Sequence, residues 1–240
     1  MIFNKTGRLI RRTFSFGNTQ LEMVKEYKYL GFLVTPSFNI TTALVDLKDR
    51  GLRAYGALRG KLGFSFRKHI PTTLYLFDSL IKPILLYASD FWATLKLPQN
   101  TPAELLHRKF CKQLLGVNLQ TTNNAVYLEL GRLPLEIYAK KNAAKNWDRI
   151  YLKQTGNELL LASCNTPTEN NWVSTVKNTF EKVDMLGTFL NENLSEAITP
   201  FSALFYRERD VFIQTALNSI QTMSKMKTYA LLKPNWKIED

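Results

Sequence analysis

The helical character of this chain is clearest in residues 109–138, KFCKQLLGVNLQTTNNAVYLELGRLPLEIY. Gly116 and Gly131 each follow an apolar stretch, and a glycine in the left-handed conformation commonly ends a helix. Pro134 suits the first turn of the next helix, where a backbone N–H has no helical partner and its loss does no harm. The stretch therefore predicts three successive helices separated by two turns, with the third helix running to about Lys153.

The segment LELGRLPLE at 128–136 looks like a motif, but its pattern is structural. A helix end, a glycine cap, a two-residue link and a proline start account for it without any ligand. We expect four apolar side chains around this turn to be buried: Tyr127, Leu130, Leu133 and Leu135. Glu129 and Arg132 can form an ion pair or contact nucleic acid, and the sequence leaves both alternatives open.

Further helices are predicted upstream. Thr101 is a suitable N-cap for a helix that Pro102 begins and Gly116 ends. Another helix begins near residue 39 and ends at Gly63, and its apolar residues recur at helical spacing: Leu44, Leu47, Gly51, Tyr55, Leu58 and Leu62. Between these two helices, Pro71 begins a helix to about Leu80, and Pro83 should kink or split it.

Downstream, the helical signal is weaker. Residues 154–170 are polar and mark a domain boundary, because the stretches QTGNE and NTPTEN favour turns. A weaker helix is predicted over 171–190, and a long final helix from Thr199-Pro200 to about Ala230. The most apolar window, 70–97, is interrupted by Asp78, Lys82, Pro83 and Asp90, which favours a buried helix pair over a membrane span.

The amino-terminal residues 12–35 alternate as β-strands do. Phe14 and Phe16 lie two residues apart, and Gly17-Asn18 supplies a turn before the alternation resumes. Residues 27–34 are predicted to form one further strand. The fold class is therefore mainly α, with a small N-terminal antiparallel sheet of two or three strands followed by a multi-helix bundle and a helical carboxyl-terminal region. We divide the chain at 1–38, 39–153 and 154–240.

The composition is that of a basic globular protein. The chain has 240 residues, of which 45% are hydrophobic, enough for one large or two small domains with a core. Residues 1–153 hold 24 Lys and Arg against 10 Asp and Glu, whereas residues 154–240 hold 8 against 10. The net charge of +12 thus divides into +14 in residues 1–153 and −2 in residues 154–240. This favours contact of the front part with a polyanion, although an ordinary basic surface explains it as well.

No pattern of catalytic or metal-binding residues is present in the sequence. Cys111 and Cys164 lie far apart and both histidines are isolated, which argues against a zinc site. There is no GxSxG, HExxH or glycine-rich phosphate loop. Asp46 and Asp49 lie among basic residues, so surface ion pairs explain them better than a metal site. The few cysteines and the polar residues soon after Met1 predict an intracellular protein of nucleus or cytoplasm that is not secreted.

Five segments carry a resemblance to a known family: MIFNKTGR at 1–8, EYKYLGFLVT at 26–35, PILLYASDFWA at 83–93, residues 109–138, and SKMKTYALLKP at 224–234. In this order they resemble the carboxyl-terminal part of the reverse transcriptases of non-LTR (LINE-type) retrotransposons. The resemblance is dense over residues 1–153 and extends into the tail. It implies the last strands of a polymerase palm, a helical thumb and part of a following helical region.

The same resemblance implies that the catalytic half of the polymerase is missing. An intact parent enzyme copies RNA into DNA with Mg²⁺ held on aspartates that include an adjacent Asp-Asp pair. This chain contains no Asp-Asp pair, so we expect it to have no polymerase activity alone and no cofactor. The implied partners are RNA, DNA or an RNA–DNA hybrid, and the palm and fingers half of the polymerase, but no membrane.

The resemblance implies that residues of two segments near the amino terminus contact nucleic acid. By resemblance, Tyr29, Leu30 and Gly31 occupy the primer-grip position, where a strand pair at the palm–thumb junction holds the primer 3′ end. A glycine there allows close backbone approach; the alternative is a buried strand with Gly31 at a bulge. Lys5, with Thr6, matches the Lys-Thr pair that closes the palm motif, and it needs the rest of the palm to position it on a phosphate.

The helix from residue 39 supplies the leading candidates. Arg50, Arg53 and Lys61 are predicted to face away from its apolar stripe, and by resemblance a thumb helix lies along the minor groove of the template–primer duplex. Weaker candidates are Arg67, Lys68, Arg108 and Lys109, with Lys112, Lys140, Lys141 and Lys145 in the same class. A solvated helix face is the alternative. Trp92 and Trp147 are expected to anchor the core rather than stack on bases.

The function expected from these observations is sequence-independent binding of template–primer nucleic acid by a truncated reverse transcriptase. One rival is a domesticated helical module that binds protein, which predicts weak, salt-insensitive nucleic-acid binding. The other is a non-functional relic of a decayed element. It predicts poor stability, because the sheet has lost its palm partners and exposes apolar edges.

Overall fold

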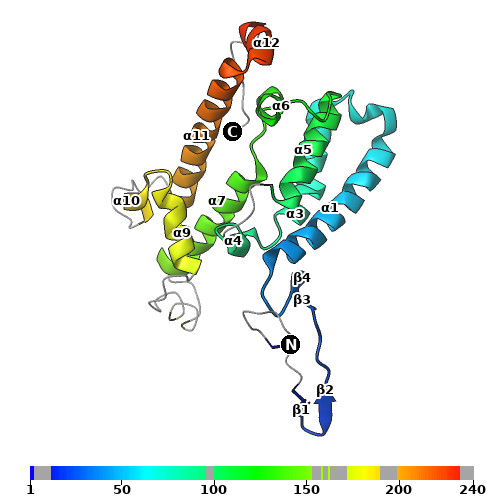
Figure 1. Ribbon diagram of the computed structural model, residues 1–240, viewed down its shortest axis with the longest axis vertical. Coiled ribbons are helices and arrows are strands. Elements are labelled where there is room, and N and C mark those ends of the chain that lie inside the picture. The colour runs from blue at the N-terminus through cyan, green and yellow to red at the C-terminus, as the bar shows by residue number, and fades with distance from the viewer. Residues whose placement is uncertain are drawn as a thin grey trace.

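The computed structural model of the chain is mainly helical, as predicted. It describes residues 1–2, 12–95, 100–152, 158, 162, 172–189 and 199–232. Figure 1 shows two short β-hairpins at one end, a group of helices beyond them, and the long helix α11 (Pro200–Thr222) along one side. Among the helices of the described residues, none is long and apolar enough to cross a membrane.

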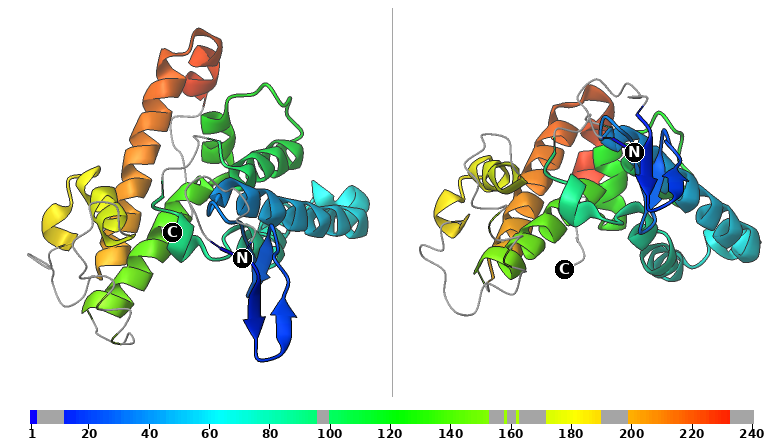
Figure 2. Two further views of the ribbon diagram at one scale, coloured as in Figure 1. Left: turned by 60° about the horizontal axis from the view of Figure 1, so that its bottom comes forward. Right: turned by 90° about the horizontal axis from the view of Figure 1, so that it is seen from below.

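The amino-terminal strands form two separate hairpins. β1 (Phe14–Phe16) pairs antiparallel with β2 (Thr19–Leu21), and Gly17-Asn18 forms the turn, as predicted. β3 (Tyr27–Tyr29) pairs antiparallel with β4 (Phe32–Val34). The prediction of one continuous strand over 27–34 is wrong, because Leu30 and Gly31 have φ angles of 46° and 86° and reverse the chain between β3 and β4. The β1–β2 hairpin projects away from the helices in Figures 1 and 2.

Helix α1 (Ile40–Leu62) has the predicted bounds and buried face. The Asn39 side chain accepts a hydrogen bond from the Thr41 N–H at 3.0 Å, which caps the first turn. Gly63, with a φ of 49°, ends the helix, and its N–H donates to the Arg59 carbonyl. Its buried residues are Ala43, Leu44, Leu47, Gly51, Tyr55 and Leu58. Close packing requires a glycine at position 51, because a Cβ there would lie only 2.6 Å from Leu85 Cδ2.

The apolar window after α1 is broken into short helices. A 3₁₀ turn η1 (Gly63–Phe66) leads to α2 (Ile70–Leu80), which Pro71 opens as predicted. Pro83 separates α2 from α3 (Lys82–Leu85), and α4 (Ser89–Trp92) follows. The predicted helix pair is thus three helices, because Ala88 adopts a left-handed φ of 54° and turns the chain again.

The region 101–152 follows its predicted caps closely. Helix α5 (Pro102–Leu115) begins after Thr101, whose hydroxyl accepts the Glu104 N–H at 3.3 Å. Gly116 and Gly131 both adopt the left-handed conformation, at the ends of α5 and of α6 (Asn123–Leu130). Helix α7 (Leu135–Trp147) continues as a π-helix, η2 (Asp148–Leu152).

The carboxyl-terminal helices are α9 (Trp172–Glu181), α10 (Leu186–Phe189), α11, η3 (Ser224–Met226) and α12 (Lys227–Leu232). The final helix predicted to reach about Ala230 is interrupted at Met223, whose extended backbone ends α11. Residues 153–157, within which the predicted division at 154 falls, lie outside the described part of the chain.

Several hydrophobic clusters connect the helices. The largest contains residues of α1, α2, α3, α5 and α6, with Phe77 and Phe110 stacked at its centre, 3.9 Å between ring centroids. Trp92 and Trp147 are both buried in smaller clusters, which confirms their predicted core role. Helix α11 shares clusters with α6 through Ala216 and with α7 through Phe205. The carboxyl-terminal helices therefore pack directly on the middle of the chain.

Candidate nucleic-acid interface

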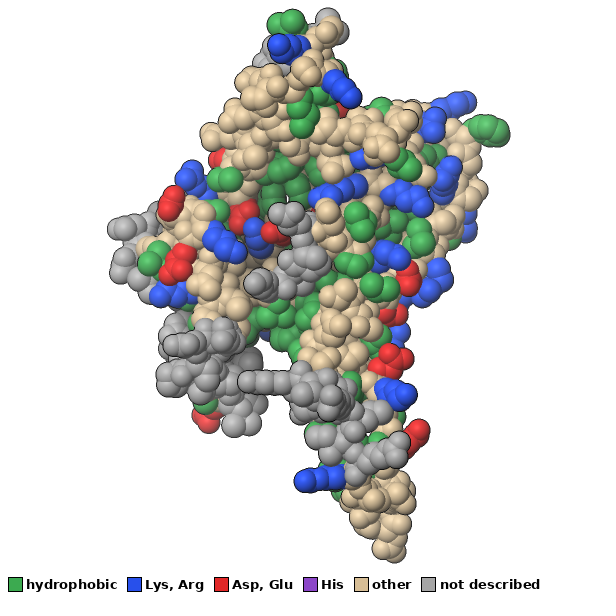
Figure 3. All heavy atoms as spheres, viewed as in Figure 1, with side chains coloured by type: hydrophobic (Ala, Val, Ile, Leu, Met, Phe, Trp, Pro, Cys, Tyr) green, Lys and Arg blue, Asp and Glu red, His purple; other side chains and the backbone are tan. Residues whose placement is uncertain are grey.

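Positive charge is concentrated in one uninterrupted stretch. Between Arg50 and Phe77 the sequence contains six Arg and Lys residues and no Asp or Glu. This stretch covers the last part of α1, the turn η1 and most of α2. In Figure 3, Lys and Arg side chains gather over the side of the molecule formed by α1 and α5, where few acidic side chains lie among them. A surface of this kind attracts polyanions, since no carboxylate within the stretch neutralises it.

Arg53 and Lys61 lie on the exposed side of α1, as predicted. They are eight residues apart, in one row of helical neighbours, so about 12 Å separates them along the helix axis. Within the described part of the chain, neither has an acidic partner at ion-pair distance. Their charges are therefore free to contact an external anion.

Arg50 has a different environment from the other two leading candidates. Its Nη2 atom donates to the Gly31 carbonyl at 2.8 Å and lies 2.8 Å from Asp46 Oδ2. The side chain is half-buried beneath the β3–β4 hairpin, so it fastens this hairpin to α1. Asp46 also lies 3.9 Å from Lys28 Nζ, and Asp49 pairs with Lys48 at 2.7 Å, which confirms the predicted surface ion pairs.

The expected primer-grip residues form the exposed turn between β3 and β4. Tyr29 and Leu30 are 62% and 75% exposed, so the alternative of a buried strand is wrong. The two carbonyls of the turn are used internally, because Tyr87 donates its hydroxyl to Leu30 O and Arg50 donates to Gly31 O. A rigidly held turn that exposes an aromatic and an aliphatic side chain is suited to contact another molecule.

The weaker candidates lie at two places. Arg67 and Lys68 are exposed after η1, and Arg67 Nε donates to the Gln113 carbonyl at 3.2 Å, which places it beside the end of α5. Lys109 is exposed on α5, whereas Arg108 is half-buried, donates to the Asn100 side chain and lies 3.7 Å from Glu104. Lys5, the remaining candidate, lies outside the described residues.

Two further lysines named from the sequence are occupied within the protein. Lys112 is buried and donates to the Leu119 carbonyl at 2.8 Å. Burial and the nearby charge of Arg108 lower the pKa of Lys112. Lys140 lies between two carboxylates, 3.0 Å from Glu136 and 2.8 Å from Glu208. These contacts make both lysines structural.

The charged residues around the α6–α7 turn are also structural. The Arg132 guanidinium is buried and donates both terminal nitrogens to the carboxylate of Asp78 on α2. Burial alone raises the pKa of Asp78, but the hydrogen bonds and charge of Arg132 outweigh it, so this pKa lies below its usual value. Glu129 accepts a hydrogen bond from the Tyr229 hydroxyl. Within the described residues Arg132 therefore pairs with Asp78, and contact of Glu129 with nucleic acid stays a prediction.

A buried polar centre beside this pair was not predicted. Glu104 accepts the Leu135 N–H at 2.7 Å and the Tyr127 hydroxyl, although only 4% of its surface is exposed. Burial raises the pKa of Glu104, but His107, Tyr127 and Arg108 outweigh it and lower this pKa. The sequence signal was misleading, because Thr-x-x-Glu at 101–104 indicates a capping box in which the glutamate would serve its own helix. Instead Glu104 caps α7, whose N-cap is a proline without a capping side chain.

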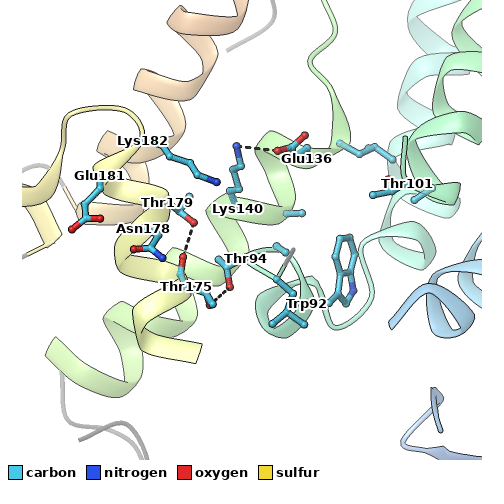
Figure 4. Close-up of a pocket in the computed structure, with 15 residues that line it drawn as sticks. Trp92, Thr94, Thr101, Glu136, Lys140, Thr175, Asn178, Thr179, Glu181 and Lys182 are labelled. Atoms are coloured by element: carbon cyan, nitrogen blue, oxygen red, sulfur yellow. Dashed lines mark hydrogen bonds and ion pairs between the residues drawn. The ribbon is translucent and has the colours of Figure 1, made fainter. Parts of the chain in front are cut away.

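A pocket lies away from the basic stretch. It has a volume of about 770 Å³ and lies between α4, α7 and α9. Figure 4 shows Lys140 turned toward Glu136 and the hydroxyls of Thr94 and Thr175 hydrogen-bonded to each other, while the Thr179 hydroxyl donates to the Thr175 carbonyl within α9. Lys140, Glu136 and these three threonine hydroxyls of the lining are thus already paired within the protein. Among the described residues, no three His, Cys, Asp or Glu side chains converge as metal ligands would.

No protein-family model, no curated protein and no solved structure matches this chain. The function of the chain is therefore inferred from its residues and from the surfaces described above.

Proposed function

We propose that this chain binds RNA, DNA or an RNA–DNA hybrid without sequence preference, through the basic surface of α1 and the turn that follows it. The observation that supports this is the acid-free stretch from Arg50 to Phe77, in which Arg53, Lys61 and Lys68 are exposed. Lysine and arginine that contact phosphates release condensed counterions, which gives affinity that depends on salt but not on sequence.

The test is to replace Arg53, Lys61 and Lys68 together by alanine. Hybrid and duplex oligonucleotides are titrated in fluorescence anisotropy at several salt concentrations. The slope of log affinity against log salt concentration should become shallower by about 2 to 3, because each lost phosphate contact removes about 0.9. The affinity should fall equally for unrelated sequences.

The matched control replaces three exposed lysines of the carboxyl-terminal region: Lys182, Lys225 and Lys227. This variant loses the same net charge in another place, so it separates a local interface from the general attraction of a basic protein. An unaltered affinity and salt slope in the first variant, or equal losses in both, would contradict the proposal.

We further propose that the chain is the carboxyl-terminal part of a non-LTR retrotransposon reverse transcriptase. In this proposal β3–β4 belongs to the end of the palm, α1 to α7 form the thumb, and the missing palm and fingers half is a partner. The aromatic and aliphatic side chains exposed on the hairpins support it, since they are suited to packing against further strands. Without the parent's aspartates, which hold Mg²⁺, the chain alone should extend no primer.

A helical module that binds protein is the second candidate. The observation that favours it is the same exposed apolar surface, in which Phe16 is 82% exposed. The two candidates differ in their salt dependence: a protein-binding module predicts weak nucleic-acid binding that barely changes with salt concentration.

A further inference from the structure

A phenylalanine stands out at the end of the basic surface. Phe64 is 96% exposed, the highest value of any large hydrophobic side chain in the described residues. It lies in the turn η1, directly after α1. A single exposed ring is ordinary on a protein surface, so the way this ring is held and the charges around it decide whether it serves as a binding site.

The turn that carries Phe64 is held firmly. Phe66, two residues on, is buried against Tyr55 and Phe110, with ring centroids 6.2 and 6.1 Å away. The Thr73 hydroxyl donates to the Phe66 carbonyl at 3.0 Å, and the Lys68 N–H donates to the Ser65 carbonyl at 3.1 Å. On the other side of Phe64, the Gly63 N–H donates to the Arg59 carbonyl. The backbone is thus held on both sides of Phe64, so little backbone conformational entropy would be lost when its ring binds.

Basic residues flank Phe64 on both sides in the sequence, with small residues directly beside it. Arg59, Lys61, Arg67 and Lys68 are all exposed within five residues of it in the sequence. From residue 59 to residue 69, Phe64 is the only large apolar side chain with an exposed surface, since Leu62 is half-buried and Phe66 is buried. A single exposed ring offers too little apolar area for a protein or membrane contact. It is suited to one nucleobase, which can stack on the ring while the flanking phosphates contact the cations.

From this geometry we infer that Phe64 is a base-stacking site that binds an unpaired nucleotide, such as the overhanging end of a duplex. This inference rests on the proposed nucleic-acid binding and adds to it a preference for exposed base faces. Every base has a π face, so stacking strengthens binding without reading sequence. A continuous duplex offers such a face only at its ends.

The experiment compares two hybrid duplexes that differ only in a three-nucleotide overhang. One overhang carries bases and the other is abasic, so both have the same phosphates and only one allows stacking. The unmodified chain should bind the base-containing overhang about tenfold more tightly. Phe64→Ala should remove this preference while the salt slope stays unchanged, and Phe64→Trp should retain it. Phe64→Leu, which keeps an apolar side chain without a π face, should behave as Phe64→Ala does.

Phe16→Ala is the matched control, because Phe16 is equally aromatic and 82% exposed but lies on the β1–β2 hairpin. The inference is overturned if Phe64→Ala keeps the preference for bases, if Phe16→Ala alone removes it, or if the unmodified chain shows none. It is also overturned if Phe64→Ala abolishes binding to anionic phospholipid vesicles and leaves the overhang preference intact. The proposal of nucleic-acid binding has its own test: it is contradicted when the triple variant of Arg53, Lys61 and Lys68 leaves affinity and salt slope unaltered.

Discussion

Glu104 and Arg132 are charged residues buried among the helices. In each case hydrogen bonds within the protein replace those that the charged group would make to water. Arg132 joins the α6–α7 turn to α2 through Asp78, and Glu104 joins α5 to the middle of α6 through Tyr127 and to the start of α7 through Leu135. A buried charge deprived of such partners is strongly destabilising. These residues therefore hold the turn between α6 and α7 in place.

Glu104→Ala should lower the free energy of unfolding by about 2 to 4 kcal/mol, because it leaves the Leu135 N–H and the Tyr127 hydroxyl buried without an acceptor. Urea denaturation followed by circular dichroism measures this. Glu181→Ala, at an exposed position, serves as the control and should change stability by less than about 0.5 kcal/mol. Equal effects of the two changes would show that Glu104 is not a structural acceptor.

His107 predicts a dependence of stability on pH. It is fully buried between Phe77 and Tyr127, and neither ring nitrogen has a hydrogen-bond partner among the described residues. Burial lowers the pKa of His107; Glu104, 3.7 Å away, opposes this shift, whereas Arg132 and Lys82 add to it. The folded state thus binds the proton less readily than the unfolded state does, so stability is complete above about pH 6.5 and falls as the pH decreases below it.

Urea denaturation at a series of pH values between about 5 and 7.5 tests this dependence. His107→Phe keeps an aromatic ring against Phe77 and should flatten the decrease, which amounts to at most about 1.4 kcal/mol per pH unit. His69→Phe, at an exposed position, should leave the decrease unchanged. A decrease that persists in His107→Phe would assign it to other groups.

At the scale of single elements, most boundaries lie where capping residues and prolines predict. Thr101, Gly116, Gly131 and Gly63 end or begin helices as expected, because a cap depends on backbone conformation within a few residues. The exception is the β3–β4 turn, where Leu30 occupies a left-handed conformation that sequence patterns assign to Gly, Asn or Asp. The hydrogen bonds from Tyr87 and Arg50 compensate for that unfavourable conformation.

The same substitution should have opposite effects at two glycines. Gly116→Ala should destabilise the chain by about 1 kcal/mol or more, because its φ is 71° and a Cβ would lie 3.1 Å from Arg67 Nη1. Gly60→Ala, inside α1 with nothing within 4 Å of the added atom, should stabilise it by about 0.5 to 1 kcal/mol. Thermal denaturation of both variants provides the measurement. A shift of equal sign would contradict the assigned backbone conformations.

At the scale of the whole molecule, the carboxyl-terminal helices are part of the fold that carries the basic surface. Phe205 on α11 packs against Leu133 and Ile137 of the α6–α7 region, and Lys141 Nζ lies 4.2 Å from the centre of its ring. Ile220, near the other end of α11, packs with Leu128 of α6. The middle and carboxyl-terminal helices should therefore unfold together.

Phe205→Ala should lower the free energy of unfolding by about 3 kcal/mol, because it removes a buried ring from the contact between α11 and α7. Circular dichroism and tryptophan fluorescence should report one coincident urea transition, shifted in the variant. Leu231→Ala, with 83% of the residue exposed, is the control and should not shift it. Two separate transitions would instead support an independent carboxyl-terminal domain.

The sequence by itself determined the helical fold class, the apolar face of α1 and most helix ends. Each of these depends on residues within one or two turns of one another, through caps, fixed proline angles and apolar spacing. It also identified Arg53 and Lys61 as exposed cations, since the face opposite an apolar stripe is solvent-facing.

Only the tertiary structure decided which charges face inward. Arg132 finds Asp78 54 residues away, Glu104 finds Leu135 31 residues away, and Arg50 reaches the Gly31 carbonyl across 19 residues. Local spacing cannot distinguish such residues from solvated ones, because their partners become neighbours only when the helices pack. The tertiary structure also decided which of the two phenylalanines in the short turn η1 is exposed. Phe66 is buried against Tyr55 and Phe110, whereas Phe64 is exposed to solvent.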